Sequence, residues 1–205
     1  MEDKITTIKS WLGTGAVNIF GLPMSGKDTQ GIKLAEAIDG KFISSGMIIR
    51  SMESERRENY TKDGSLIPTD IFYEWVLPYL SRPDLAEYPL VLSSIGRWFG
   101  EEDEVMATAR NAGHEIKAAI VLNISESEVE HRYYVAKSLN DRGSRADDRD
   151  LNIFRHRLEE FRDKTLPVIR HYQNLGLLVE VPGNVSREDV FEAIVNRLYI
   201  KATTS

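Results

Sequence analysis

A glycine-rich segment with a single lysine, GLPMSGKDTQ at residues 21–30, is the part of the sequence best suited to chemistry. Its G-x-x-x-x-G-K core lets consecutive backbone N–H groups turn toward an oxyanion, and the glycines at both ends permit that backbone geometry. The lysine adds a positive charge that reaches the β- and γ-phosphates of a nucleoside triphosphate. The segment predicts a triphosphate site formed by Gly21, Met24, Ser25, Gly26, Lys27, Asp28 and Thr29.

Such a loop requires a strand before it and a helix after it, because the helix N-terminus adds partial positive charge near the phosphates. Apolar runs predict buried strands at Ala16–Phe20, Lys41–Ile43, Pro89–Leu92, Ala118–Leu122 and Leu177–Val181. Apolar residues at helical spacing predict helices at Lys27–Ile38, Thr69–Leu80, Glu102–Asn111, Glu126–Ala136, Leu151–Asn174 and Arg187–Tyr199. A short amphipathic helix at residues 5–12 is expected to cover one end of the sheet. This alternation implies an α/β fold with a parallel, doubly wound sheet.

The composition of the 205-residue chain is that of one ordinary globular domain. No apolar run approaches the roughly 18–20 residues of a membrane span, and the acidic start Met1-Glu2-Asp3 predicts no signal peptide, so we expect a cytoplasmic protein. The lack of cysteine excludes disulfides, thiol catalysis and cysteine-based zinc sites. A formal net charge of −6 argues against nucleic acids and acidic membrane surfaces as partners.

Ordered segments across the chain share their motifs with one family. The loop at 21–30 is similar to G-x-P-G-x-G-K-G-T-Q, FISSGMIIR at 42–50 to I-S-T-G-D-M-L-R, GSLIPTD at 64–70 to G-x-L-V-P-D/T-E/D, and SSIGR at 93–97 to D-G-F-P-R. SRADD at 144–148, RLEEFRDKTLPVIRHY at 157–172 and VPG at 181–183 are similar to G-R-x-D-D, R-L-x-x-Y-x-x-x-T-x-P-L-I-x-Y-Y and V/I-D-G. The sequence thus resembles the adenylate kinase family of nucleoside monophosphate kinases.

The resemblance implies a P-loop NTPase-type five-stranded parallel sheet with helices on both faces, a helical monophosphate-binding segment and a very short lid. Within one P-loop kinase domain, residues 1–205, it implies a core (14–44, 84–130 and 160–205), a monophosphate-binding segment (45–83) and a lid (136–148). The implied reaction is reversible transfer of the γ-phosphoryl of ATP to a nucleoside monophosphate, with AMP expected, giving two ADP. Mg²⁺ accompanies ATP, and a monomer is expected, with self-association left open.

The resemblance also gives roles to five arginines, because this transfer gathers negative charges in one cleft and a guanidinium contacts phosphate oxygens in pairs. Arg50 and Arg97 are implied to hold the phosphate of the monophosphate. Arg132, Arg145 and Arg157 are implied to line the donor side and clamp the transferring group. The predicted catalytic residues are therefore Lys27, Arg97, Arg132, Arg145 and Arg157. The alternative is that these arginines are surface residues whose stems cover apolar neighbours.

Substrate capture falls, by the same resemblance, to residues near these arginines. The Gly183–Val185 turn is implied to offer backbone groups to the donor base, which adds Arg132 and Val185 to the ATP-binding set. The monophosphate-binding set is Ser45, Gly46, Arg50, Leu66, Ile67, Arg97 and Glu101. Ordinary loop and core packing is the alternative for the apolar members.

Two carboxylates that serve the shell of Mg²⁺ in the family are missing, because Ser93 and Met47 occupy their positions. Asp28 stands beside the loop lysine where the family has glycine, and we hypothesise that it supplies an outer-shell carboxylate. Thr29 supplies the hydroxyl that usually follows the lysine directly. Alternatively, Asp28 only stabilises the helix N-terminus.

Glu101 stands where the family has a glutamine that reads the adenine edge. An ionised carboxylate only accepts hydrogen bonds, so it suits the N1–H and amino group of guanine better than N1 of adenine. We hypothesise that acceptor specificity is relaxed or shifted away from AMP. The alternative is a first-turn acid that points to solvent.

The lid is the third departure from the family pattern. Only the segment KSLNDRGS at 137–144 lies where longer members carry a small extra domain, so a short lid without structural zinc is expected. Ala136 replaces a second lid arginine, and Lys137 or Arg142 could substitute. One extra residue before Arg157 allows either Arg157 or His156 to face the cleft, and the register of the following motif favours Arg157.

Two other functions remain open. One is a P-loop kinase for a small non-nucleotide metabolite, which the match of Arg50, Gly64–Asp70 and Arg97 to monophosphate capture argues against. The other is a non-catalytic nucleotide sensor, motivated by the missing carboxylates. The retention of Lys27 with the arginine set argues against a sensor, which needs only the loop.

Overall fold

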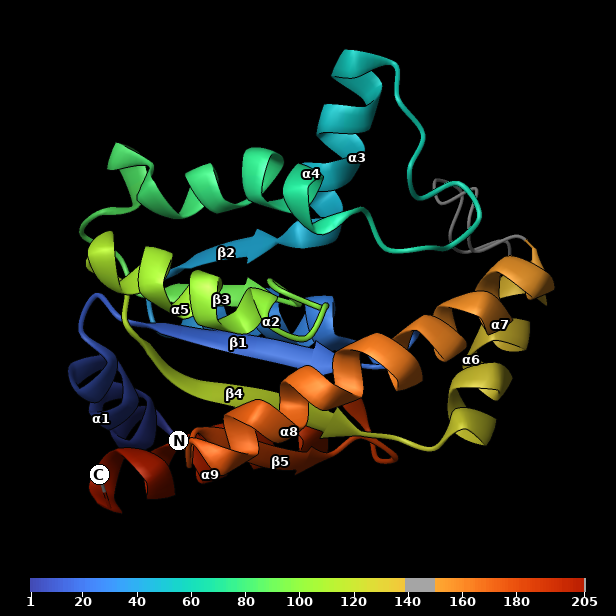
Figure 1. Cartoon of the computed structure of the whole chain (residues 1–205). Helices are drawn as coiled ribbons and strands as arrows, with labels where there is room; N and C mark the ends of the chain where they lie inside the picture. Colours follow the sequence, from blue (N-terminus) through green and yellow to red (C-terminus); the bar gives the residue numbers. More distant parts are fainter. Residues whose placement is uncertain (139–149, 205) are drawn as a thin grey trace.

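The computed structural model describes residues 1–138 and 150–204, and a parallel sheet lies at its centre (Figure 1). The strands are β1 (Ala16–Gly21), β2 (Lys41–Ser44), β3 (Leu90–Ser93), β4 (Ile116–Asn123) and β5 (Leu178–Pro182). They pair in the order β2-β3-β1-β4-β5, and each pairing is parallel. Each strand lies within two residues of its predicted bounds. The predicted five-stranded α/β fold is confirmed over the described residues.

Helices cover both faces of the sheet, because successive strand residues point to opposite sides. Val17 and Ile19 belong to one buried cluster, and Ala16 and Phe20 to the other. The first face carries α1 (Glu2–Leu12), α2 (Lys27–Ala37) and α9 (Arg187–Thr204). The second cluster joins α3 (Ser45–Arg56), α4 (Thr69–Trp75), α5 (Glu101–Asn111), α6 (Glu126–Ser138), α7 (Leu151–Glu160) and α8 (Leu166–Asn174).

The predicted N-terminal helix forms and packs where expected. α1 contacts α9, and Ile8 and Leu12 are buried against both the sheet and α9. Lys117 at the start of β4 donates to the backbone carbonyl of Trp11 at 2.6 Å, which fixes α1 beside the amino ends of the strands (Figure 1). No helix in the described part of the chain is long and apolar enough to cross a membrane.

Two predicted helices are interrupted, and prolines explain both breaks. The helix predicted over 151–174 contains a π-helical turn, η4 (Phe161–Thr165), between α7 and α8. Pro167 lacks the N–H that would continue the ladder, and the wider turn instead joins the N–H of Leu166 to the carbonyl of Phe161. Pro78 likewise ends the regular helix α4, which continues as the 3₁₀ helix η1 (Leu77–Ser81), followed by η2 (Pro83–Leu85).

The carboxyl ends of the strands meet at one edge of the sheet, where α/β folds bind their ligands. β1 leads into the glycine-rich loop and α2, and β2 leads directly into α3. The segment proposed to bind the monophosphate, residues 45–83, comprises α3, α4 and η1; α3 begins at this edge, and the chain from α4 onward runs back over the sheet (Figure 1). Of the predicted lid at 136–148, residues 139–148 lie outside the described part of the chain.

Candidate active site

The glycine-rich loop has the backbone geometry that its sequence predicts. Met24 and Gly26 adopt φ of 66° and 87°, and α2 begins directly afterwards at Lys27. A side chain at Gly21 would place its Cβ 2.6 Å from Ser25 Oγ, so only glycine fits there. Ser25 Oγ is buried without a hydrogen-bond partner. Because a buried hydroxyl usually has a partner, this atom is well placed for an anionic ligand in the loop.

A cavity of about 450 Å³ opens beside the loop and brings together residues from three parts of the chain that were predicted to bind the donor; it is called the donor cavity below. The predicted residues that line it are Met24, Ser25, Gly26, Thr29, Arg132 and Val185. His131, Val135, Ser186 and Arg187 line it as well, and no motif in the sequence points to them. Gly21, Lys27 and Asp28 belong to the same loop without lining this cavity.

Arg132 joins the loop to the turn that follows β5. Its guanidinium donates to the carbonyls of Ser25 at 3.4 Å and Gly183 at 2.9 Å, and to Glu128 Oε1 at 2.8 Å. Three of its N–H groups therefore serve protein acceptors. This geometry favours a role in shaping the donor cavity, and the predicted clamp on the transferring group stays a prediction.

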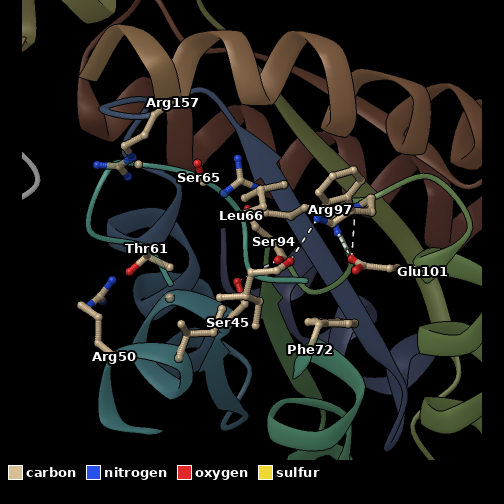
Figure 2. A pocket seen from close by; sticks show the side chains of 15 residues that line it. Ser45, Arg50, Thr61, Ser65, Leu66, Phe72, Ser94, Arg97, Glu101 and Arg157 are labelled. Carbon is tan, nitrogen blue, oxygen red and sulfur yellow. Dashed lines mark hydrogen bonds between the residues drawn. The ribbon is translucent and has the colours of Figure 1, made fainter. Parts of the chain in front are cut away.

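A second, smaller pocket of about 100 Å³ collects the residues predicted for the acceptor (Figure 2). The predicted members lining it are Ser45, Gly46, Arg50, Leu66, Ile67, Arg97 and Glu101. Arg157 also lines the pocket, whereas His156 does not. Arg157 therefore lies at this pocket and not at the cavity beside the phosphate loop, where the resemblance implied it, and its part in the transfer stays a prediction. Arg145, the remaining arginine of the predicted catalytic set, lies outside the described residues.

Arg97 carries a positive charge that the protein itself compensates poorly. Its Nε donates to Thr165 Oγ1 at 3.3 Å. Burial and the neighbouring charge of Arg157 lower the pKa of the Arg97 guanidinium to about 10, although Glu160 and Glu101 oppose this shift. An anion between the two arginines would relieve their repulsion. The pocket is therefore suited to a phosphate group.

Glu101 is buried, with 2% of its surface exposed, so the solvent-facing alternative is wrong. Its Oε2 accepts from the backbone N–H groups of Arg97 at 2.8 Å and Trp98 at 3.0 Å, and its Oε1 accepts from Thr69 Oγ1 at 2.8 Å. Burial raises the pKa of this carboxyl, and these hydrogen bonds act in the opposite direction. Glu101 thus shapes the loop that carries Arg97, and Oε1 keeps one lone pair for a ligand.

Asp28 and Ser93 lie together, although the sequence treats them as separate departures from the family. Ser93 Oγ donates to Asp28 Oδ1 at 2.6 Å, which joins the first turn of α2 to the end of β3. The Asp28 carboxylate therefore reaches the position from which a family member extends its own aspartate. Carboxylate and hydroxyl oxygens fit the preference of Mg²⁺ for oxygen ligands and ordered water.

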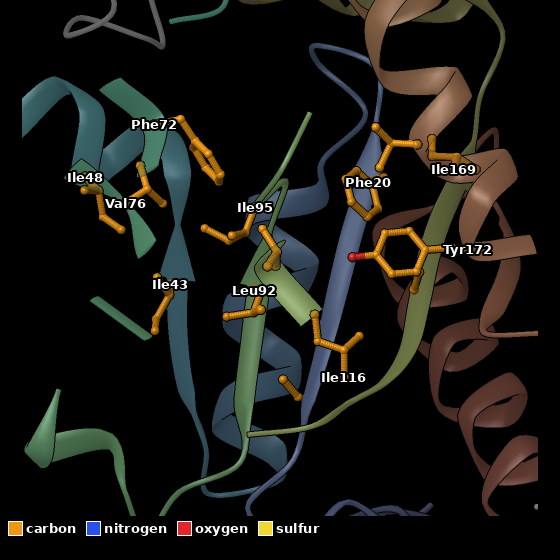
Figure 3. Close-up of a cluster of buried hydrophobic side chains, with 14 of the residues drawn as sticks. Phe20, Ile43, Ile48, Phe72, Val76, Leu92, Ile95, Ile116, Ile169 and Tyr172 are labelled. Atoms are coloured by element: carbon orange, nitrogen blue, oxygen red, sulfur yellow. The ribbon is translucent and has the colours of Figure 1, made fainter. Parts of the chain in front are cut away.

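The acceptor pocket shares Ile67 and Phe72 with the hydrophobic core, and Figure 3 shows part of that buried cluster. Phe72 lines the pocket and belongs to the same buried cluster as Ile48, Val76 and Ile95. Gly64 has φ of 91°, and a Cβ there would lie 2.9 Å from Arg157 Cγ. The absence of a side chain at Gly64 therefore lets the segment before α4 lie directly against α7.

Several residues at the acceptor pocket were not predicted from the sequence. Trp98 lines the pocket and donates through Nε1 to the carbonyl of Ile67 at 3.2 Å. Ser65 Oγ lies 3.0 Å from His156 Nε2 on α7. The position of Trp98 next to Arg97 was the one signal in the sequence that could have predicted it at the pocket. The contacts of Ser65 with His156 and of Leu66 with Glu160 join segments about 90 residues apart, so no local pattern predicts them.

Comparisons with known proteins agree with this geometry. No family model matches the chain. The adenylate kinase of Mycobacteroides abscessus is 31% identical over 181 residues, covering 85% of this chain and 94% of the relative. The chain belongs to the adenylate kinase family. Other members are similar: the adenylate kinases of Thermus thermophilus (28% identical, 87% of this chain and 94% of the relative) and Mycobacterium tuberculosis (29%, 89% and 98%).

A solved structure has a fold similar to that of this chain. A gluconokinase from Sinorhizobium meliloti superposes with a TM-score of 0.60 at 19% identity, covering 92% of this chain and 94% of that one. At this identity the likeness concerns the fold alone, and it confirms the P-loop α/β architecture. Family membership, fold and phosphate loop together identify the chain as a P-loop phosphotransferase.

Proposed function

We propose that the protein is a nucleoside monophosphate kinase that reversibly transfers the γ-phosphoryl of ATP to a monophosphate, with AMP as the first candidate. The observation that carries the proposal is the acceptor pocket, in which Arg50, Arg97 and Arg157 line one space. Ser94 also lines this pocket, and the neighbouring Ser93 donates to Asp28 of the phosphate loop. A nucleoside monophosphate places a dianionic phosphate among these arginines and a flat base against Ile67 and Phe72. The curated relatives named above support adenylate kinase activity in particular.

The roles of the individual residues follow from charge and position. The loop amides and Lys27 bind the donor phosphates, and Arg97 with Arg157 orients the acceptor and stabilises charge on the transferring group. Mg²⁺ neutralises charge on the β- and γ-phosphates when ATP is bound. Asp28, Ser93 and Thr29 are the residues that would hold its water shell. Arg145 completes the proposed clamp.

A coupled assay for ADP formation tests the proposal. ATP is offered with AMP, GMP, CMP or UMP, with and without Mg²⁺, and with gluconate as a non-nucleotide acceptor. Turnover with at least one monophosphate supports the proposal. Nucleotide binding without turnover would favour a sensor, and turnover with gluconate alone would favour a metabolite kinase.

Relaxed acceptor specificity is a second candidate, which the buried Glu101 favours. The lone pair left on Oε1 can accept one base N–H, and a carboxylate offers nothing to N1 of adenine. Glu101→Gln keeps an oxygen for the backbone N–H groups of Arg97 and Trp98 and adds an amide donor. We expect the ratio of kcat/KM for AMP to that for GMP to rise about tenfold. An unchanged ratio, with unchanged stability, would contradict base reading by Glu101.

Magnesium dependence tests the partnership of Asp28 and Ser93. Asp28→Gly is expected to raise the half-saturating Mg²⁺ concentration about tenfold at constant ATP, because the carboxylate near the phosphates is lost. Adding Ser93→Asp to this variant supplies a carboxylate from β3, in the family arrangement, and is expected to restore the wild-type value. An unaltered Mg²⁺ dependence in Asp28→Gly would limit Asp28 to stabilising the start of α2.

A further inference from the structure

One wall of the acceptor pocket is closed by a series of contacts that the proposed chemistry does not use. Glu160 Oε2 accepts from the backbone N–H of Leu66 at 3.0 Å. Lys164 Nζ lies 2.7 Å from the same oxygen and 2.6 Å from Glu160 Oε1, and 3.9 Å from the centre of the Trp98 ring. The indole N–H of Trp98 then donates to the carbonyl of Ile67. We call these contacts the Glu160–Lys164–Trp98 bridge. The bridge starts at the backbone of Leu66 and ends at the backbone of the next residue, Ile67.

The Glu160–Lys164–Trp98 bridge is shielded from water, so its contacts are stronger than those of a surface ion pair. The side chains of Glu160 and Lys164 are 8% and 24% exposed. The ammonium satisfies both oxygens of a nearly buried carboxylate and lies over an aromatic face, where a desolvated cation is attracted most. Removal of the ammonium would leave the carboxylate with the N–H of Leu66 and the electrostatic influence of Arg97.

The π-helical turn η4 connects the bridge to the phosphate-binding arginine. Lys164 and Thr165 are consecutive in η4, and Thr165 Oγ1 accepts from Arg97 Nε at 3.3 Å. Arg97 and Trp98 are consecutive in the loop after β3. One helical turn therefore contacts both the guanidinium and the indole, and π-turns of this kind occur often at functional sites.

We propose that Lys164 is a positioning residue for the acceptor. It holds residues 66–67 at a fixed distance from residues 97–98. The residues that contact the base and the arginine that binds the phosphate of the monophosphate are then in position before the monophosphate binds. This inference rests on the proposed function, because it assigns Lys164 to the acceptor half of that site. The donor cavity is lined by other residues, so donor binding does not depend on the bridge.

Steady-state kinetics separate the two halves of the site. Lys164→Met keeps the apolar stem over Trp98 and removes the charge, and it is expected to raise the KM of the acceptor monophosphate about tenfold. The KM of ATP is expected to stay within twofold of wild type. Lys164→Arg keeps a cation over the ring and is expected to recover most of the acceptor affinity. Lys41→Met is the matched control, because Lys41 lies 4.2 Å from the Tyr88 ring, outside both cavities.

Calorimetric binding of AMP without ATP gives a readout that does not depend on turnover. Lys164→Met is expected to weaken the acceptor Kd about tenfold. Trp98→Phe, which keeps the aromatic face and loses the N–H to Ile67, is expected to weaken it as well, and the double variant less than the sum of the two. An unchanged acceptor Kd in both folded single variants would overturn the inference, as would an equal loss for ATP. A wild-type protein that turns over no monophosphate would contradict the proposed function instead.

Discussion

Replacement of Lys27 by methionine is expected to lower kcat about 10³-fold, because the loop then lacks its full positive charge at the transferring phosphates. Lys27 is the first residue of α2, where the helix N-terminus adds only partial charge. Methionine keeps the length of the stem and a good helix propensity, so the fold should be retained. The measurement is ADP formation in the coupled assay with saturating ATP and AMP.

Lys33→Met is a suitable control, since Lys33 lies on the same helix and contacts the Phe191 ring at 4.4 Å, outside both cavities. Its kcat should stay within twofold of wild type. The melting temperatures of both variants show whether a loss of rate reflects unfolding. A folded Lys27→Met protein that keeps more than a tenth of wild-type kcat would place the main stabilisation of phosphate charge elsewhere.

Local chemistry explains why the phosphate loop and the strands were predictable. The conformation of the loop follows from glycines at fixed spacing, and Gly21 is required because Ser25 Oγ leaves no room for a Cβ. The five strands appear as short apolar runs because both faces of the sheet are covered by helices. Both features leave a local signature in the sequence, although the burial of the strands comes from helices elsewhere in the chain.

Pairings between distant residues explain what the sequence could not predict. Asp28 and Ser93 seemed to be separate departures from the family, but they form one hydrogen-bonded pair across 65 residues. The Glu160–Lys164–Trp98 bridge joins three segments, and no local pattern distinguishes its lysine from a surface residue. The periodicity of residues 151–174 also hid the π-turn, because Pro167 is compatible with the start of a new helix.

Replacement of Arg97 by methionine is expected to have opposite effects on activity and on stability. The kcat/KM for the acceptor should fall about 10³-fold, since a bidentate phosphate contact is lost. The free energy of unfolding of the ligand-free protein should rise by about 1 kcal/mol, because a charge disfavoured in the folded state is removed. Burial lowers the pKa of the Arg97 guanidinium to about 10, so this cost is fully present at neutral pH and declines only as the pH rises above about 10.

Arg97→Lys separates the two effects, because it keeps a charge and loses the planar fork that binds phosphate oxygens in pairs. It should lose activity about 10²-fold without the gain in stability. Arg110→Met on the last turn of α5, where Arg110 is exposed, should change neither quantity. Urea unfolding with and without AMP measures the stability, and AMP should stabilise the wild type more than Arg97→Met. Equal stabilisation of both proteins by AMP would show that the phosphate does not meet Arg97, and would assign this pocket to another ligand.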